Sequence, residues 1–62
     1  MRRVKASEVK ASDVYCEFDA GRGDWSSFVV LAVWKLPRTN KVRIYGERRD
    51  VICNADSIVL IA

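Results

Sequence analysis

Apolar and polar residues alternate along much of this chain with the two-residue period of a β-strand. The clearest run is Val14–Asp19. The predicted inner face of this strand consists of Val14, Cys16 and Phe18, and the predicted outer face of Tyr15, Glu17 and Asp19. Residues 20–24 follow with two glycines, which supply the positive φ values that a hairpin turn needs. The chain is therefore expected to reverse direction there.

The next predicted strand covers residues 25–36 and is rich in β-branched and aromatic side chains. One face is expected to carry Phe28, Val30, Ala32, Trp34 and Leu36. The other face would carry Val29, Leu31 and Val33. A strand that is apolar on both faces lies inside a covered barrel or buries its outer face in an interface. We therefore expect both sides to be shielded from water, with Trp34 in the core.

Three shorter strands complete the prediction. After a loop at residues 37–40, residues 41–45 alternate cleanly, with Val42 and Ile44 pointing inward. The outward side chains of that strand are Lys41, Arg43 and Tyr45. The remaining strands are predicted at residues 48–53 and 58–61. The residues before Val14 suit a short strand or turn and then a corner, with room for one helical turn around residues 7–10.

Five short strands joined by tight turns predict an all-β fold in which residues 1–62 form one domain. The preferred architecture is a small five-stranded antiparallel SH3-like barrel, because closure removes the sheet edges that invite aggregation. Sm-like and OB-like barrels are the next alternatives. An open meander that a dimer partner completes is the last.

The order of short segments along the chain also carries a family resemblance. Those segments are Val4-Lys5-Ala6-Ser7, Ser12-Asp13-Val14, Trp25 ahead of Val29-Val30, Lys41-Val42-Arg43-Ile44 and Asp56-Ser57-Ile58-Val59-Leu60. This order resembles that of small SH3-like barrel proteins of actinobacterial phages, which commonly have glycine at the position of Ser12. The resemblance implies a phage-encoded accessory protein in the cytosol of a bacterial host. It brings no catalytic residues with it.

Positive charge is concentrated in one part of the chain. Eleven Lys and Arg residues against eight acidic ones give a net charge of +3. Residues 35–49 contain six cations and one anion, so this window carries 6 − 1 = +5 and the remainder −2. Its side chains suited to phosphates and bases are Arg38, Lys41, Arg43, Tyr45, Arg48 and Arg49. They predict a nucleic-acid-binding surface as the alternative function, or else a solvated strand face whose cations prevent edge pairing.

A protein partner is the preferred hypothesis. Half of the residues are hydrophobic, which is a high share for 62 residues, so part of the apolar surface is expected to be covered by another subunit or a host protein. Trp25 lies beside the glycine-rich turn and is predicted to be a rim aromatic that anchors such a partner. We therefore expect a homo-oligomer or a complex with a host protein.

Catalysis finds little support in the composition. The chain has no histidine, which removes the commonest general base and metal ligand. Cys16 and Cys53 lack the spacing of a zinc site and are expected to be reduced, small apolar residues, although an oxidising compartment would allow them to pair. The prediction is a non-enzymatic binding module with no catalytic residue, cofactor, metal or small-molecule substrate.

The predicted compartment is the cytoplasm, without a membrane partner. No apolar run approaches the ~18 residues of a membrane span. The N-terminal residues are charged but have no apolar stretch behind them of the kind a signal peptide contains.

Overall fold

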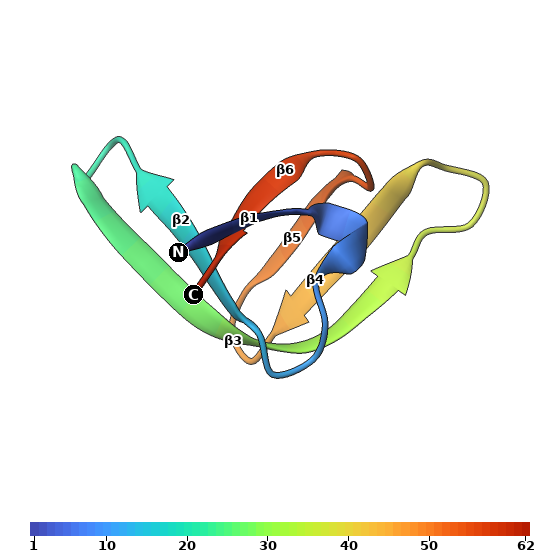
Figure 1. The fold of residues 1–62 in the computed structure, drawn as a ribbon, viewed down its shortest axis with the longest axis horizontal. Coiled ribbons are helices and arrows are strands. Elements are labelled where there is room, and N and C mark those ends of the chain that lie inside the picture. The colour runs from blue at the N-terminus through green and yellow to red at the C-terminus, as the bar shows by residue number, and fades with distance from the viewer.

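Six β-strands form a single antiparallel sheet in the computed structural model, which describes residues 1–62 (Figure 1). The elements in chain order are β1 (Arg2–Lys5), the 3-10 turn η1 (Ala6–Glu8), β2 (Val14–Asp19), β3 (Asp24–Lys35), β4 (Lys41–Gly46), β5 (Asp50–Asn54) and β6 (Ile58–Ile61). The order across the sheet is β1-β6-β2-β3-β4-β5. The all-β prediction is confirmed, with one strand more than expected because β1 pairs with β6.

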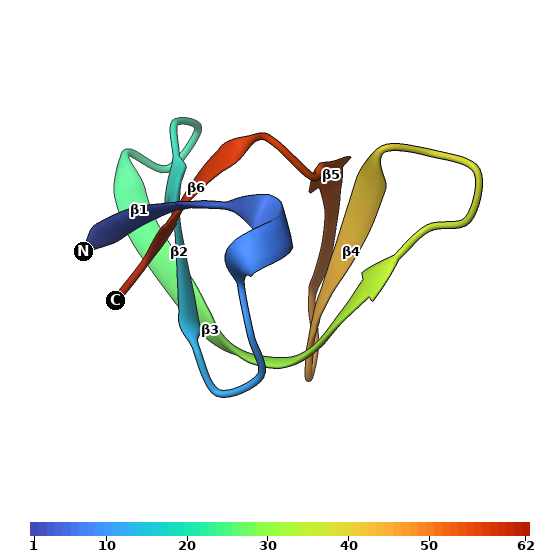
Figure 2. The same ribbon diagram turned by 45° about the vertical axis from the view of Figure 1, so that its right-hand side comes forward.

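The long strand β3 belongs to both halves of the sheet. Its first part pairs with β2 from Asp24 to Val29, and its second part pairs with β4 from Val30 to Lys35. The register shifts between Val30 and Ala32, which leaves Leu31 as an extra residue. Such a bulge bends a strand and increases its twist. β3 therefore turns a corner, with β1, β6 and β2 on one side and β4 and β5 on the other (Figure 2).

The bulge also changes which side chains point inward. One extra residue reverses the two-residue alternation for the rest of the strand. Val30 is buried as predicted, but beyond the bulge Val33 packs against the core and Trp34 is 51% exposed. The predicted inner face of residues 25–36 is therefore wrong in its second half. On the other side of this strand Val29 and Leu31 are exposed in the single chain, so the expected shielding does not come from the chain itself.

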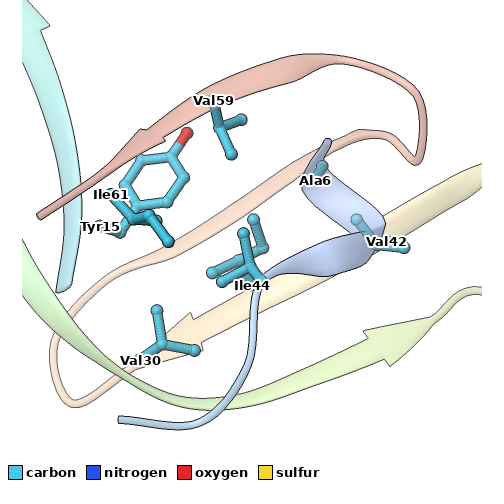
Figure 3. Packing of buried hydrophobic residues seen from close by; sticks show 8 residues of the cluster. Ala6, Tyr15, Val30, Val42, Ile44, Val59 and Ile61 are labelled. Atoms are coloured by element: carbon cyan, nitrogen blue, oxygen red, sulfur yellow. The ribbon is translucent and has the colours of Figure 1, made fainter. Parts of the chain in front are cut away.

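The hydrophobic core lies between the two halves of the sheet (Figure 3). Its eight buried residues are Ala6, Val9, Tyr15, Val30, Val42, Ile44, Val59 and Ile61. Ile44 of β4 and Ile61 of β6 come from opposite halves of the sheet. Both point into the core and are almost completely buried. The alternation predicted for β4 is confirmed, because Val42 and Ile44 are the inward residues of that strand.

The turn η1 sits over the gap between the halves. The backbone N–H of Lys5 donates to the Glu8 carboxylate at 2.8 Å, and this closes the turn. The N–H groups of Ala6 and Ser7 donate to the carbonyl oxygens of Ser57 and Ala55, at 2.8 and 3.0 Å. These bonds tie η1 to the β5–β6 connection and hold Ala6 in the core. The helical turn expected around residues 7–10 is thus present, shifted slightly toward the N-terminus.

A left-handed residue forms the corner that leads from η1 into β2. Ser12 has a φ of 78°, in the region that favours glycine. The corner is held on β3, since the Ser12 N–H donates to the Val30 carbonyl and the Val30 N–H donates to the Asp13 carbonyl, both at 2.8 Å.

The sheet is open, with β1 and β5 as its two edge strands. The two edges are not hydrogen-bonded to each other, so the ring of strands that a closed barrel requires is not completed. The one helical segment, η1, is far too short to cross a membrane.

Candidate interaction surfaces

The faces of β2 are reversed relative to the prediction. Tyr15, expected outside, is only 7% exposed, whereas Phe18, expected inside, is 53% exposed. The Tyr15 ring stacks on Phe28 of the neighbouring strand, with ring centroids 5.1 Å apart. The alternation of β2 was therefore correct, but its core-facing side is the one that carries Tyr15.

Because β2 presents its apolar residues outward, one outer surface of the molecule is hydrophobic. The register places Phe18 opposite Trp25, Cys16 opposite Leu60, and Val14 opposite Val29. Residues that share this side of β2, β3 and β6 form what we name the outer apolar face: Val14, Cys16, Phe18, Trp25, Val29, Ile58 and Leu60. None of these residues is charged, and four of them are large and about half exposed.

Trp25 lies at the hairpin end of the outer apolar face. Its ring packs against Phe18 with a centroid distance of 5.4 Å and a tilt of 58°. The hairpin turn is built as expected: Asp19 accepts hydrogen bonds from the N–H groups of Gly21 and Arg22, and Gly23 has a φ of 67°. Trp25 is 48% exposed, so the side chain predicted to be a rim aromatic is available at the surface.

A second aromatic pair lies on the outer side of β3 and β4. Trp34 stacks on Tyr45 with ring centroids 5.7 Å apart and planes inclined by 16°. The Arg43 guanidinium lies 5.7 Å from the Trp34 centroid and 5.3 Å from the Tyr45 centroid. Its Nε donates to the Asp50 carboxylate at 2.6 Å, and its Nη2 forms an ion pair with the same carboxylate. We name Trp34, Tyr45 and Arg43 the aromatic platform.

The structure brings together part of the predicted basic surface. Lys41, Arg43 and Tyr45 alternate outward along β4 as expected. Arg38 is exposed in the β3–β4 loop, where it has a φ of 62°. Trp34 was missed because the bulge reverses β3 just before it; only a bulge signal at Leu31 would have indicated its exposure.

Arg49 leaves that surface and contacts the other half of the sheet. Its guanidinium forms an ion pair with Glu17 and donates to the Ser26 hydroxyl at 2.9 Å. Its Cζ atom also lies 5.5 Å from the centroid of the Phe28 ring. Arg49 therefore links the β4–β5 turn to β2 and β3, and it pairs with a different carboxylate from Arg43.

Arg48, in the same turn, borders a surface groove of about 370 Å³. The groove is lined by Ser27, Phe28, Val29, Leu31, Glu47, Arg48 and Arg49. Val29 belongs to both the groove and the outer apolar face, so the two are continuous. Arg48 is thus separated from the aromatic platform and lies beside apolar surface.

Two titratable groups are affected by the core. Burial raises the pKa of the Tyr15 hydroxyl, the Cys53 thiol raises it further, and Arg49 opposes both. Burial also raises the pKa of Cys53 itself. Cys16 and Cys53 are unpaired. No group of three or more Asp, Glu, Cys or His side chains is arranged to hold a metal ion.

Comparison of the chain with protein-family models, with curated proteins and with solved structures gave no match.

Proposed function

We propose that this protein is a non-enzymatic binding module that pairs with a second copy of itself through the outer apolar face. The observation that carries the proposal is the exposure of Phe18, Trp25, Val29 and Ile58 on one continuous surface. Exposed apolar patches with central aromatic side chains are typical of protein interfaces. The absence of histidine from the chain agrees with a binding role.

A second copy fits this face better than a charged partner would. The four large side chains of the face leave roughly 400 Å² of apolar surface in water, taking an aromatic side chain as ~200 Å². Two such faces would bury about 800 Å² together, the size of a weak, reversible interface. The part of the face on β2 and β3 contains no charged side chain, so two identical copies can meet there without like-charge repulsion, while Arg3 and Lys5 of β1 lie at its margin beside Leu60 and Ile58.

The size of the core supports the same proposal. Only 9 of the 62 residues are buried within one chain, so an isolated copy covers little of its apolar surface. Pairing of the outer apolar faces would shield β2, the first part of β3 and β6 from water on the side that faces away from the core. The two-sided apolar pattern of β3 would then be explained over its first half.

For the fold, we propose an incompletely closed SH3-like barrel. The support is β3, which serves both halves and turns its corner at a bulge, the way in which small packed sheets exchange strands. With it we retain the proposal of a phage-type accessory protein in a bacterial cytosol, for which the support is the resemblance in segment order.

The molecular mass in solution tests self-association. Sedimentation equilibrium should give 2 × 7.1 = 14.2 kDa for the wild-type chain. Trp25→Ser should give a folded monomer, because it removes the largest aromatic side chain of the face. Trp34→Ser is the matched control, since it changes the same residue type on the same strand at nearly equal exposure, 51% against 48%. That variant should remain a dimer.

Two results would contradict the proposal. A wild-type mass of 7.1 kDa at several hundred micromolar protein would mean that the face does not pair with itself. A dimer that Trp34→Ser dissociates and Trp25→Ser leaves intact would assign the interface to the other half of the sheet. Circular dichroism of each variant verifies that it is folded.

A further inference from the structure

The aromatic platform has the features of a surface on which nucleobases stack. Trp34 and Tyr45 are nearly parallel, and Trp34 leaves half of its surface in water on the outer side of the sheet. Aromatic rings at this kind of exposure stack with bases of any sequence, because every base has a π-face. A buried pair of rings would not have this property.

Two cations without an acidic partner lie by the β3–β4 loop at one end of the platform. Arg38 lies in the loop, and Lys41 begins β4 on the same side of the sheet as Arg43. Lys35, which ends β3, pairs with the inward Val42 and therefore lies on the other side. The chain contains only two ion pairs, Arg43 with Asp50 and Arg49 with Glu17. The charges of Arg38 and Lys41 are therefore free to contact phosphate groups.

Arg43 has a different role from the phosphate contact that its sequence position suggests. Its guanidinium is held by Asp50 and lies against both rings. A guanidinium neutralised by a carboxylate contributes little net attraction for phosphate. Arg43 is therefore a positioning residue that orients Trp34 and Tyr45.

We propose that this face binds single-stranded nucleic acid, with bases stacked on Trp34 and Tyr45 and phosphates held by Arg38 and Lys41. A single strand is required because the bases of a duplex are already stacked on each other and do not offer their faces. The site lies on the half of the sheet opposite the outer apolar face, so it does not depend on self-association.

Fluorescence anisotropy with a labelled 15-nucleotide oligo(dT) and the intact chain tests the proposal. Affinity should fall with salt, with a slope of log K against log salt of about −1.4 for two phosphate contacts on a single strand. Trp34→Ala should weaken binding by about 5- to 100-fold through loss of base stacking. Trp34→Phe, which keeps a ring, should recover most of the affinity. Lys10→Gln, which removes an exposed cation outside both surfaces, should bind like the wild type.

The cations have a separate readout. The double variant Arg38→Gln with Lys41→Gln should make the salt slope shallower by about 1.4, because each lost phosphate contact removes about 0.7. Equal affinity for a 15-base-pair duplex, or for poly-glutamate of similar length, would overturn the proposal in favour of general polyanion attraction. Unchanged affinity of Trp34→Ala would overturn it as well. The oligomeric state of each variant, measured in parallel, keeps this outcome distinct from a failure of self-association.

Discussion

Replacing Gly46 by alanine would disturb the contact that joins the two halves of the sheet. Gly46 ends β4 and is buried, and the Phe28 ring of β3 lies directly on its backbone. A Cβ atom added at Gly46 would lie 2.3 Å from Cδ2 and 2.8 Å from Cε2 of that ring. Ordinary contacts between carbon atoms are about 3.5–4.0 Å, so the ring would have to move by more than ~1 Å.

The ring has little freedom to make that movement. It stacks on Tyr15 on the core side and carries the Arg49 guanidinium at 5.5 Å. Overpacking of this kind costs about 1–3 kcal/mol. Gly46 does not have a positive φ, so alanine fits its backbone conformation. Alanine also reduces the conformational entropy of the unfolded chain, which stabilises the folded state by about 0.4–1 kcal/mol. We expect Gly46→Ala to lower the free energy of unfolding by about 1–2 kcal/mol.

Urea unfolding followed by circular dichroism at one fixed protein concentration measures this change. With a slope near 1 kcal/mol per molar urea, the midpoint should fall by about 1–2 M. Gly21→Ala is the control, because the nearest atom to its new Cβ is the Asp19 carboxylate at 3.3 Å, on a flexible exposed side chain. It should shift the midpoint much less.

A double-mutant cycle identifies the cause. In a Phe28→Ala background the ring is absent, so Gly46→Ala should cost at least about 1 kcal/mol less than in the wild type. Two results would contradict this explanation. Gly46→Ala could be as stable as the wild type, or it could lower the free energy of unfolding equally in both backgrounds. In either case the close approach of Gly46 and Phe28 would not be what limits the size of the side chain at position 46.

The core and its titratable groups lead to two further predictions. Ile44→Ala, at a completely buried position, should lower the free energy of unfolding by about 2–5 kcal/mol. In a thermal melt Ile52→Ala, at an exposed position, should by contrast resemble the wild type, and equal losses for both would refute the assigned core. Because the folded state raises the pKa of Tyr15 and of Cys53, stability should be unaffected below their ordinary values of about 10 and 8.5 and should fall as pH rises above them. Urea midpoints between pH 8 and 11 measure this fall. The double variant Tyr15→Phe with Cys53→Ala should lose less stability over the same range. An equally steep fall in that variant would mean that Tyr15 and Cys53 are not the groups responsible.

Local patterns predicted the strands well. β6 has the predicted bounds, β2 begins and ends where its alternation does, and β4 points Val42 and Ile44 inward as expected. The β2–β3 turn follows from its glycines and Asp19. These features depend on residues close in sequence, through the pleat of a strand and the φ angles that a turn requires.

The candidate surfaces were predicted less completely. The basic outward side of β4 was found from alternation, and Trp25 was correctly placed at the surface beside the hairpin. Trp34 was assigned to the core, and Arg49 was grouped with Arg43 although it pairs with Glu17 across the fold. The cations of residues 35–49 lie on two surfaces because the β4–β5 turn brings Arg49 to Glu17 and Ser26 in the other half of the sheet.

What the sequence by itself determined is therefore the set of extended segments, their alternation and the turns between them. Which side of each segment is covered was decided only by the tertiary structure. The reason is that an alternating strand offers two faces, and burial depends on what packs against them. Tyr15 is buried because Phe28 lies beside it, and Trp34 is exposed because one extra residue at Leu31 reverses the strand that carries it.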